Sequence, residues 1–194
     1  MTDQPDAKTF RDAMRAFVGN CSVLTVGDGD QANGLVITSG ISLSADPALI
    51  LACVNRSSSS WPLFSPGGAF GWSSLGAAHQ GVAERFSGFG GVRGPARYDG
   101  AEWETTGGAR LLVGAPTAFA CTVDEMIDRA THSIIIGRVR DIRTSPGAGA
   151  LVYWDGQYRA LTWAARIWPR EGAFRPLGAA APHPLRVFQK AQDL

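Results

Sequence analysis

The feature that most constrains the fold is a series of short apolar runs, separated by turns and not alternating with long helices. Each run has the length of a β-strand, and most are rich in the β-branched and aromatic residues that strands favour. The runs occupy residues 22–26, 35–38, 48–54, 69–75, 117–126, 133–142 and 151–161, the last interrupted by Asp155-Gly156, a strong hairpin signal. The pattern predicts seven or eight antiparallel strands in a closed or partly closed β-barrel and disfavours a parallel α/β fold.

A short amphipathic helix is expected ahead of the first strand. Phe10, Met14 and Phe17 recur at the spacing of one helical face, Asp6 can cap the helix, and Gly19 marks its end. This helix is one of two or three that we expect at the periphery of the barrel.

The chain as a whole is expected to form one domain with an appendage. Its 194 residues slightly exceed the usual size of one domain. Residues 77–86 are expected to form a second helix, and residues 87–106, rich in glycine and polar side chains, a mobile loop. We expect a barrel domain over residues 1–161 and a proline- and arginine-containing extension over residues 162–194, which wraps around the domain or a partner.

The charge pattern excludes several classes of partner. Eighteen basic side chains balance 17 acidic ones, so no basic field is present to bind nucleic acid or an anionic membrane. No apolar stretch approaches the roughly 18 residues of a membrane span, and Asp3 and Asp6 do not fit a signal peptide. We expect a cytoplasmic protein that binds neither nucleic acid nor membranes.

Several common kinds of site lack their local motifs. The cysteines, Cys21, Cys53 and Cys121, are far apart in apolar runs, and the three histidines are also widely separated, so we expect no metal site. The glycine-rich segment 88–93 fails the dinucleotide fingerprint because Arg93 stands in place of the third glycine. The sequence also lacks a Walker A loop, a Gly-x-Ser-x-Gly elbow and a His-Glu-x-x-His motif.

Two hydroxyl-rich segments, residues 38–44 and 55–61, each follow an apolar run. Short hydroxyls, backbone N–H groups and the nearby Arg56 could together bind a phosphate. The alternative is that these serines only form turns and caps, since Ser60 precedes Trp61-Pro62 as an N-cap would. The residues alone leave both interpretations open.

In their order and spacing, six segments resemble the flavin reductase family of FMN-binding split barrels, the reductase components of two-component flavin-dependent monooxygenases. The segments are residues 10–17, 34–47, 55–63, 80–86, 111–114 and 132–139. The resemblance covers residues 10–161. It implies a mostly β, antiparallel Greek-key split barrel with a few peripheral helices. It also implies a homodimer that binds FMN or FAD near the subunit interface and uses NADH or NADPH as reductant.

The resemblance also implies which residues contact the flavin. These are Asn33, Leu35, Val36, Thr38, Ser39, Cys53, Val54, Asn55, Ser59, Ser60, Arg85 and Phe86. Ser59, Ser60 and Arg85 would bind the phosphate. Thr38, Ser39 and Asn55 would hydrogen-bond the ribityl chain and ring edge, whereas Leu35, Val36 and Phe86 would supply apolar surface. Cys53 and Val54 would contribute backbone groups. Arg85 could instead only complement its helix dipole, and Phe86 could be ordinary core.

On the nicotinamide side, His132 resembles the histidine of the family's Gly-Asp-His motif and is the candidate catalytic residue, and Tyr158 resembles an aromatic residue that covers the same pocket. A purely structural role for His132 is the alternative. Ala130 and Thr131 depart from this motif, and Gly40 and Trp72 stand where the family tends to show Phe and Val.

The function that the resemblance implies is NAD(P)H-dependent reduction of FMN or FAD, by hydride transfer to flavin N5, for a separate monooxygenase. Such transfer needs stacking and orientation more than an acid or base. One alternative is a flavin-bound reductase of corrin cobalt or ferric iron. Others are a repurposed, non-catalytic flavin-binding protein and, more remotely, an oxidase of a pyridoxine-type phosphate ester. The choices of FMN or FAD, NADH or NADPH, and oxygenase partner stay open.

Overall fold

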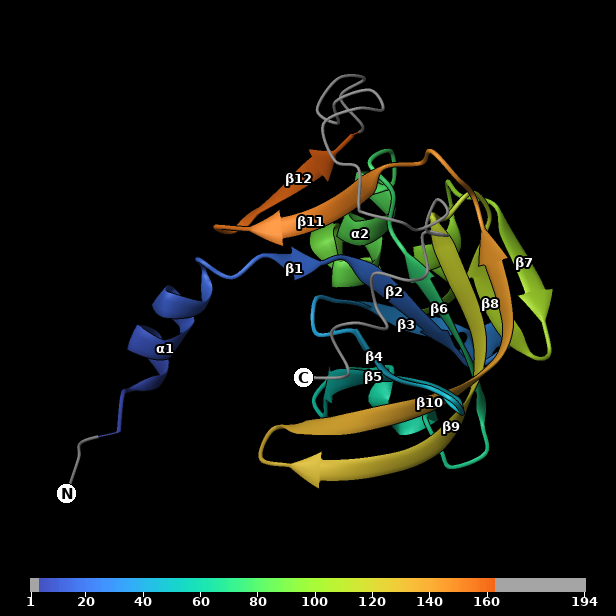
Figure 1. Cartoon of the computed structure of the whole chain (residues 1–194), viewed down its shortest axis with the longest axis horizontal. Helices are drawn as coiled ribbons and strands as arrows, with labels where there is room; N and C mark the ends of the chain where they lie inside the picture. Colours follow the sequence, from blue (N-terminus) through green and yellow to red (C-terminus); the bar gives the residue numbers. More distant parts are fainter. Residues whose placement is uncertain (1–3, 163–194) are drawn as a thin grey trace, which may run out of the picture. The chain divides into compact units, whose positions relative to one another are not determined.

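The structure, a computed structural model, describes residues 4–162 and is built mainly from antiparallel strands (Figure 1). This confirms the predicted fold class. The α-helices of this region are α1 (Ala7–Met14) and α2 (Gln80–Ser87). The strands are β1 (Gly19–Asn20), β2 (Ser22–Val26), β3 (Asn33–Ile37), β4 (Ile41–Ala45), β5 (Ala48–Asn55), β6 (Ala69–Ser74), β7 (Trp103–Thr106), β8 (Ala109–Leu112), β9 (Thr117–Arg129), β10 (His132–Thr144), β11 (Ala150–Trp154) and β12 (Gln157–Leu161). The predicted extension, from residue 163 onward, lies outside the described residues.

The main sheet has seven strands in the order β3-β2-β6-β9-β10-β5-β4. Its two edge strands are consecutive in sequence, because β3 ends at Ile37 and β4 begins at Ile41. Three residues can join opposite edges only if the sheet curls until those edges approach each other. The Ser39 hydroxyl marks this approach, since Oγ lies 3.1 Å from the Cys53 backbone N and 3.2 Å from its carbonyl O.

The long strands β9 and β10 supply much of the curvature. Each has 13 residues, and their register shifts between Ile136 and Gly137 and again between Val139 and Asp141. Such bulges bend a strand and increase its twist. Gly137 is needed where the ribbon crosses the core, because a Cβ there would lie 2.4 Å from the Phe70 ring.

Two smaller sheets accompany the main one. β1, β11 and β12 form one, and β7 pairs with β8 in the other. The core comprises two clusters of buried side chains. One gathers Leu75, Phe86 and Leu111 with residues of α2, β8 and β11; the other gathers Leu24 and Phe70 with residues of β5 and β10.

The first helix differs from its prediction in length and burial. It ends at Met14, because the following amides bond three residues back, as Phe17 does to Met14, and tighten the chain into a turn. Asp6 caps it as predicted, accepting a hydrogen bond from the Thr9 amide at 2.7 Å. No residue of α1 is buried, so its apolar face has no partner within residues 4–162.

Two segments are more regular than predicted. Residues 41–45, assigned to a hydroxyl-rich segment after a strand, form β4, whose Ile41 and Leu43 alternate with serines as an edge strand requires. The mobile loop predicted at residues 87–106 is wrong: it contains two 3-10 turns and β7. Arg97 anchors this segment by donating to the carbonyls of Gly34 and Phe86. Within residues 4–162, no helix is long and apolar enough to cross a membrane.

Candidate functional site

Two cavities adjoin the turn end of the β11–β12 hairpin. The first, of about 770 Å³, is lined by Phe10, Arg11, Asp12, Met14, Arg15, Phe17, Val18, Gly19, Thr38, His132, Tyr153, Asp155 and Gly156. The second, of about 700 Å³, is lined by Val36, Thr38, Gln80, Ser87, Tyr153, Gly156, Gln157 and Tyr158. They share Thr38, Tyr153 and Gly156, so they are neighbours with a common wall. Both fall in the size range of small-molecule and cofactor sites.

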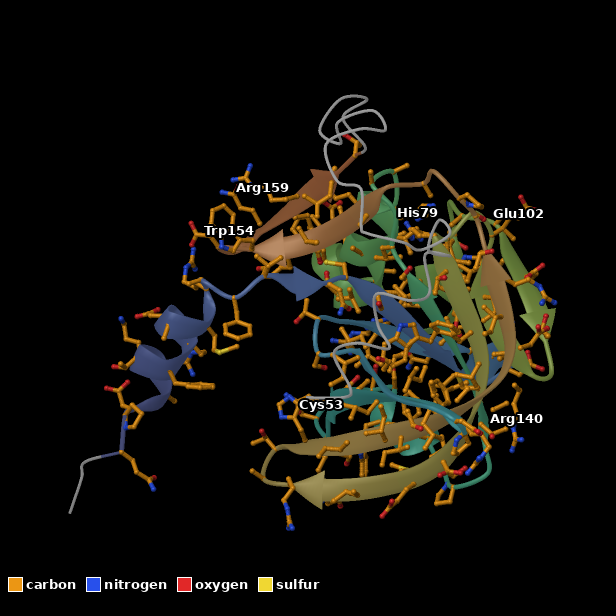
Figure 2. All side chains as sticks on the ribbon, in the orientation of Figure 1. Cys53, His79, Glu102, Arg140, Trp154 and Arg159 are labelled. Carbon is orange, nitrogen blue, oxygen red and sulfur yellow. The ribbon has the colours of Figure 1, made fainter. Side chains whose placement is uncertain are left out.

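The hairpin itself is held at its turn. Asp155 and Gly156 both have positive φ, 49° and 77°, which confirms the turn predicted from the Asp-Gly pair. Arg15 donates from Nε to Asp155 Oδ1 at 3.0 Å, and the Asp155 amide donates to the Arg15 carbonyl at 3.0 Å. This clamp joins the segment after α1 to the hairpin and closes one side of the first cavity. The exposed Trp154 and Arg159 lie on the same hairpin (Figure 2).

Thr38 and Ser39 follow β3 at the junction of the sheet edges. Thr38 is exposed and faces both cavities. Gly19 keeps room for it, because a Cβ at Gly19 would lie 2.6 Å from Thr38 Cβ. Ser39 binds the backbone of Cys53, which lies half-buried on β5 (Figure 2). Val36, also half-buried, lines the second cavity with Thr38, whereas Leu35 packs against one core cluster.

Residues 56–60, the serine-rich loop after β5, are held in place by hydrogen bonds with two asparagines. Asn55 Oδ1 accepts from both the amide and the hydroxyl of Ser57 at 2.9 Å. Asn33 Nδ2 lies 3.3 Å from the Ser59 carbonyl and from its hydroxyl. The Ser57 and Ser59 side chains are exposed. The structure thus brings predicted residues of β3 and of this loop together, and the exposed Ser59 hydroxyl, which accepts from Asn33, can still donate to a polar ligand.

Three predicted flavin contacts have buried side chains. Ser60 is 0% exposed, and its hydroxyl donates to the Gly34 carbonyl at 2.8 Å. Val54 is 0% exposed within a core cluster. Phe86 packs against the rings of both Tyr98 and Trp103, with centroids 5.2 Å and 5.3 Å away. The geometry gives these side chains packing roles and no access to a ligand. Ser60 does occupy the N-cap position before Trp61, but its side chain makes no capping hydrogen bond.

The side chain of Arg85, on α2, is bound to the segment that precedes β7. Its guanidinium donates to the Ala96 carbonyl and to Asp99 Oδ2, the latter at 3.1 Å. Its Nε is buried without a hydrogen-bond partner among residues 4–162. These contacts tie α2 to the segment that precedes β7, so the structure offers no contact between Arg85 and the serine-rich loop.

His132 and Tyr158 lie in the two neighbouring cavities. His132 opens β10 directly opposite Asn55 of β5 and lines the first cavity. Tyr158 lines the second and packs edge-on against Tyr153, with ring centroids 5.2 Å apart. Burial raises the pKa of Tyr158, so its phenol stays protonated and can donate a hydrogen bond at neutral pH.

Five lining residues of the second cavity were not predicted as site residues. They are Gln80, Ser87, Tyr153, Gly156 and Gln157. Gln80 and Ser87 lie seven residues apart on α2 and so share a face, and this spacing could have identified them. Across residues 4–162, no three His, Cys, Asp or Glu side chains gather into a group that could hold a metal ion.

The comparisons with known proteins agree with this architecture. A family model described as a flavin reductase like domain matches residues 14–162. The chain belongs to the flavin reductase family. The match confirms the family that the sequence resemblance implied.

Individual relatives cover most of the matched region. FMN reductase (NADH) RutF 2 of Methylorubrum extorquens is 35% identical over 157 residues, 80% of this chain and 90% of that flavin reductase. The actinorhodin polyketide dimerase of Streptomyces coelicolor is 31% identical over 166 residues, 84% of this chain and 92% of the relative. The solved structure of BorF, the flavin reductase component of a bacterial two-component tryptophan halogenase, matches with a TM-score of 0.70 and 33% identity, over 81% of this chain and 99% of BorF.

Proposed function

We propose that this chain is an NADH-dependent flavin reductase that reduces FMN or FAD and supplies the reduced flavin to a separate monooxygenase. The observation that carries the proposal is the pair of cavities sharing Thr38, Tyr153 and Gly156. A two-substrate redox reaction needs two ligands held against one another, and adjoining cavities with a common wall provide for that. Support also comes from relatives whose names include FMN reductase (NADH) and the reductase component of a halogenase.

The residues around the second cavity fit a flavin. Val36, Tyr153 and Tyr158 present apolar and aromatic surface, as a flat tricyclic ring requires. Thr38, Gln80 and Gln157 add hydroxyl and amide groups that match the polar edge of such a ring. The exposed hydroxyls of the serine-rich loop, with those of Thr38 and Ser39, are the candidates for the ribityl and phosphate groups. Asn33 and Asn55 order that loop and remain candidate ligands.

The first cavity is the proposed nicotinamide side, with His132 and Thr38 as its polar groups. A bound flavin supplies the redox chemistry: it gains a hydride from NADH and a proton from solvent, while NADH is oxidised to NAD⁺. The residues of this chain bind the two ligands, orient them and exclude water from between them. The Arg15–Asp155 clamp contributes by fixing the hairpin that both cavities share.

We further propose that the chain acts as a homodimer. Phe10 of α1 is 60% exposed, and Phe17, three residues after the helix ends, is 71% exposed. Exposed large apolar groups concentrated in this way mark interaction surfaces. Phe10 and Phe17 also line the first cavity, so a second copy seated on them would shield it from water. Sedimentation of the full chain at micromolar concentration measures this state.

The decisive experiment follows NADH oxidation by the purified full chain with FMN, with FAD and with no added flavin. NADH consumption that requires added flavin is expected. Turnover only with a corrin or ferric acceptor would favour a reductase with resident flavin. Tight flavin binding without NADH oxidation would favour a non-catalytic flavin-binding protein, and no response to flavin would reject the proposal. The location in the cytoplasm and the identity of the partner stay predictions.

A further inference from the structure

The tip of the β9–β10 hairpin carries His132, which lines the first cavity. His132 is the first residue of β10 and pairs with Arg129 across the hairpin and with Asn55 of β5. Only Ala130 and Thr131 connect the two strands. The position of the imidazole therefore depends on how rigidly this two-residue turn is held.

The backbone is fixed on both sides of His132. On one side, the Arg56 amide donates to the Thr131 carbonyl at 3.0 Å. On the other, the buried Ser133 hydroxyl accepts from Trp61 Nε1 at 2.8 Å and donates to Asp128 Oδ1 at 2.5 Å. Ser133 thereby uses its one donor and accepts one hydrogen bond, which ties this side of the turn to Trp61 and Asp128. What remains free at His132 is the rotation of its own side chain.

Thr131 removes that freedom, because its Oγ1 lies 2.8 Å from His132 Nδ1. A hydroxyl can donate or accept here, so the direction depends on the tautomer of the ring. Among the described residues, Nδ1 is the one protein group recorded within hydrogen-bond distance of this exposed hydroxyl. We infer that Thr131 is the positioning residue of His132, holding the ring through Nδ1 and leaving its proton on Nε2.

The consequence is a defined polarity for His132 in the first cavity. A neutral ring with its proton on Nε2 offers a hydrogen-bond donor, which matches a carbonyl acceptor such as the carboxamide oxygen of nicotinamide. This part rests on the proposed function. An aspartate at position 131 would accept rather than donate, and it would place the ring proton on Nδ1 instead. The departure from the family's Gly-Asp-His motif at Thr131 therefore changes which group the ring can bind.

The test of the tautomer uses ¹⁵N-histidine-labelled full chain without added flavin or NADH, at a pH where the ring is neutral. The two ring nitrogens give different ¹⁵N shifts when one carries the proton, and His132→Gln identifies the His132 signals among the three histidines. We expect wild type and Thr131→Ser to show the proton on Nε2, Thr131→Val to show averaged shifts, and Thr131→Asp to show it on Nδ1. A wild-type ring that averages, or a Thr131→Val spectrum like that of wild type, would overturn the inference.

A second measurement separates positioning from a general loss of structure. Thr131→Val should raise the KM for NADH by about threefold to tenfold, the effect of one lost hydrogen bond. FMN affinity measured by fluorescence quenching should stay unchanged, and Thr131→Ser should stay within about twofold of wild type. Thr105→Val, the same change at the exposed Thr105 of β7, is the matched control. An equal loss of FMN affinity in Thr131→Val would contradict the role. Failure of wild type to reduce flavin would reject the proposed function, while the ¹⁵N shifts would still decide the inference.

Discussion

Ala130 is the position where a single substitution should make this protein more stable. It is the first residue of the β9–β10 turn and has a φ of +49°. In this left-handed region a Cβ crowds the following carbonyl, at a cost of about 1–2 kcal/mol that glycine avoids. Glycine in turn gives the unfolded chain more freedom, at a cost of about 0.4–1 kcal/mol. The difference predicts that Ala130→Gly raises the free energy of unfolding by about 0.5–1 kcal/mol.

For a domain of this size, 1 kcal/mol corresponds to a shift in Tm of about 2–4 °C, so we expect a rise of about 1–4 °C. Urea unfolding followed by tryptophan fluorescence, at one fixed protein concentration, gives the free energy. Ala48→Gly is the matched control, because Ala48 is exposed at the start of β5 and its φ is not positive. There the same change should lower stability by about 0.5–1 kcal/mol. If both variants lose stability equally, the reasoning about the turn is refuted.

Two further changes test individual contacts. Ser60→Ala should lower the free energy of unfolding by about 1 kcal/mol, the value of one hydrogen bond, because Arg97 still donates to the Gly34 carbonyl at 2.9 Å. FMN affinity by fluorescence quenching should be unchanged, and a tenfold loss would assign the hydroxyl to the ligand. The Gly76 amide donates to unprotonated His79 Nδ1 at 3.0 Å, and burial lowers the pKa of His79. As the pH falls, the unfolded chain therefore binds the proton before the folded protein does. The free energy of unfolding should then decrease as the pH drops from about 7 to 5. His79→Asn, which retains an acceptor but does not titrate, should flatten this dependence of Tm on pH, and an unchanged slope would exclude His79 as its source.

The strands were predictable wherever local pattern and burial coincide. β2 occupies the predicted residues 22–26. Asp155-Gly156 forms the turn between β11 and β12, because a two-residue hairpin turn needs two left-handed residues and an Asp-Gly pair adopts that conformation readily. The segment at 87–106 was not predictable, because its order comes from distant partners. Tyr98 is buried there and donates its hydroxyl to the Asn33 carbonyl at 2.6 Å, across 65 residues of sequence. No local periodicity encodes such a contact.

The residues of the candidate site also include some that were predicted from the sequence and some that were not. Val36 on β3 and Tyr158 on β12 were predicted from the family resemblance and line the second cavity, whereas Tyr153 and Gln157 of the same β11–β12 hairpin were not predicted. Ser59 and Ser60 are neighbours of the same type, yet one is exposed and the other fully buried. Which of the two faces solvent depends on the path of the loop over Asn33 and Gly34, and that path is a property of the folded sheet.

The structure also joins two departures from the family pattern that look unrelated in sequence. The sequence resemblance places Gly40 where the family tends to show Phe, and Trp72 where it tends to show Val. In the fold, a Cβ on Gly40 would lie 2.1 Å from the Trp72 indole, so the large ring on β6 occupies the space that a side chain at position 40 would need. Cores tolerate exchanges that conserve total volume far better than single changes in size. The pair is therefore one packing exchange behind the Thr38–Ser39 junction.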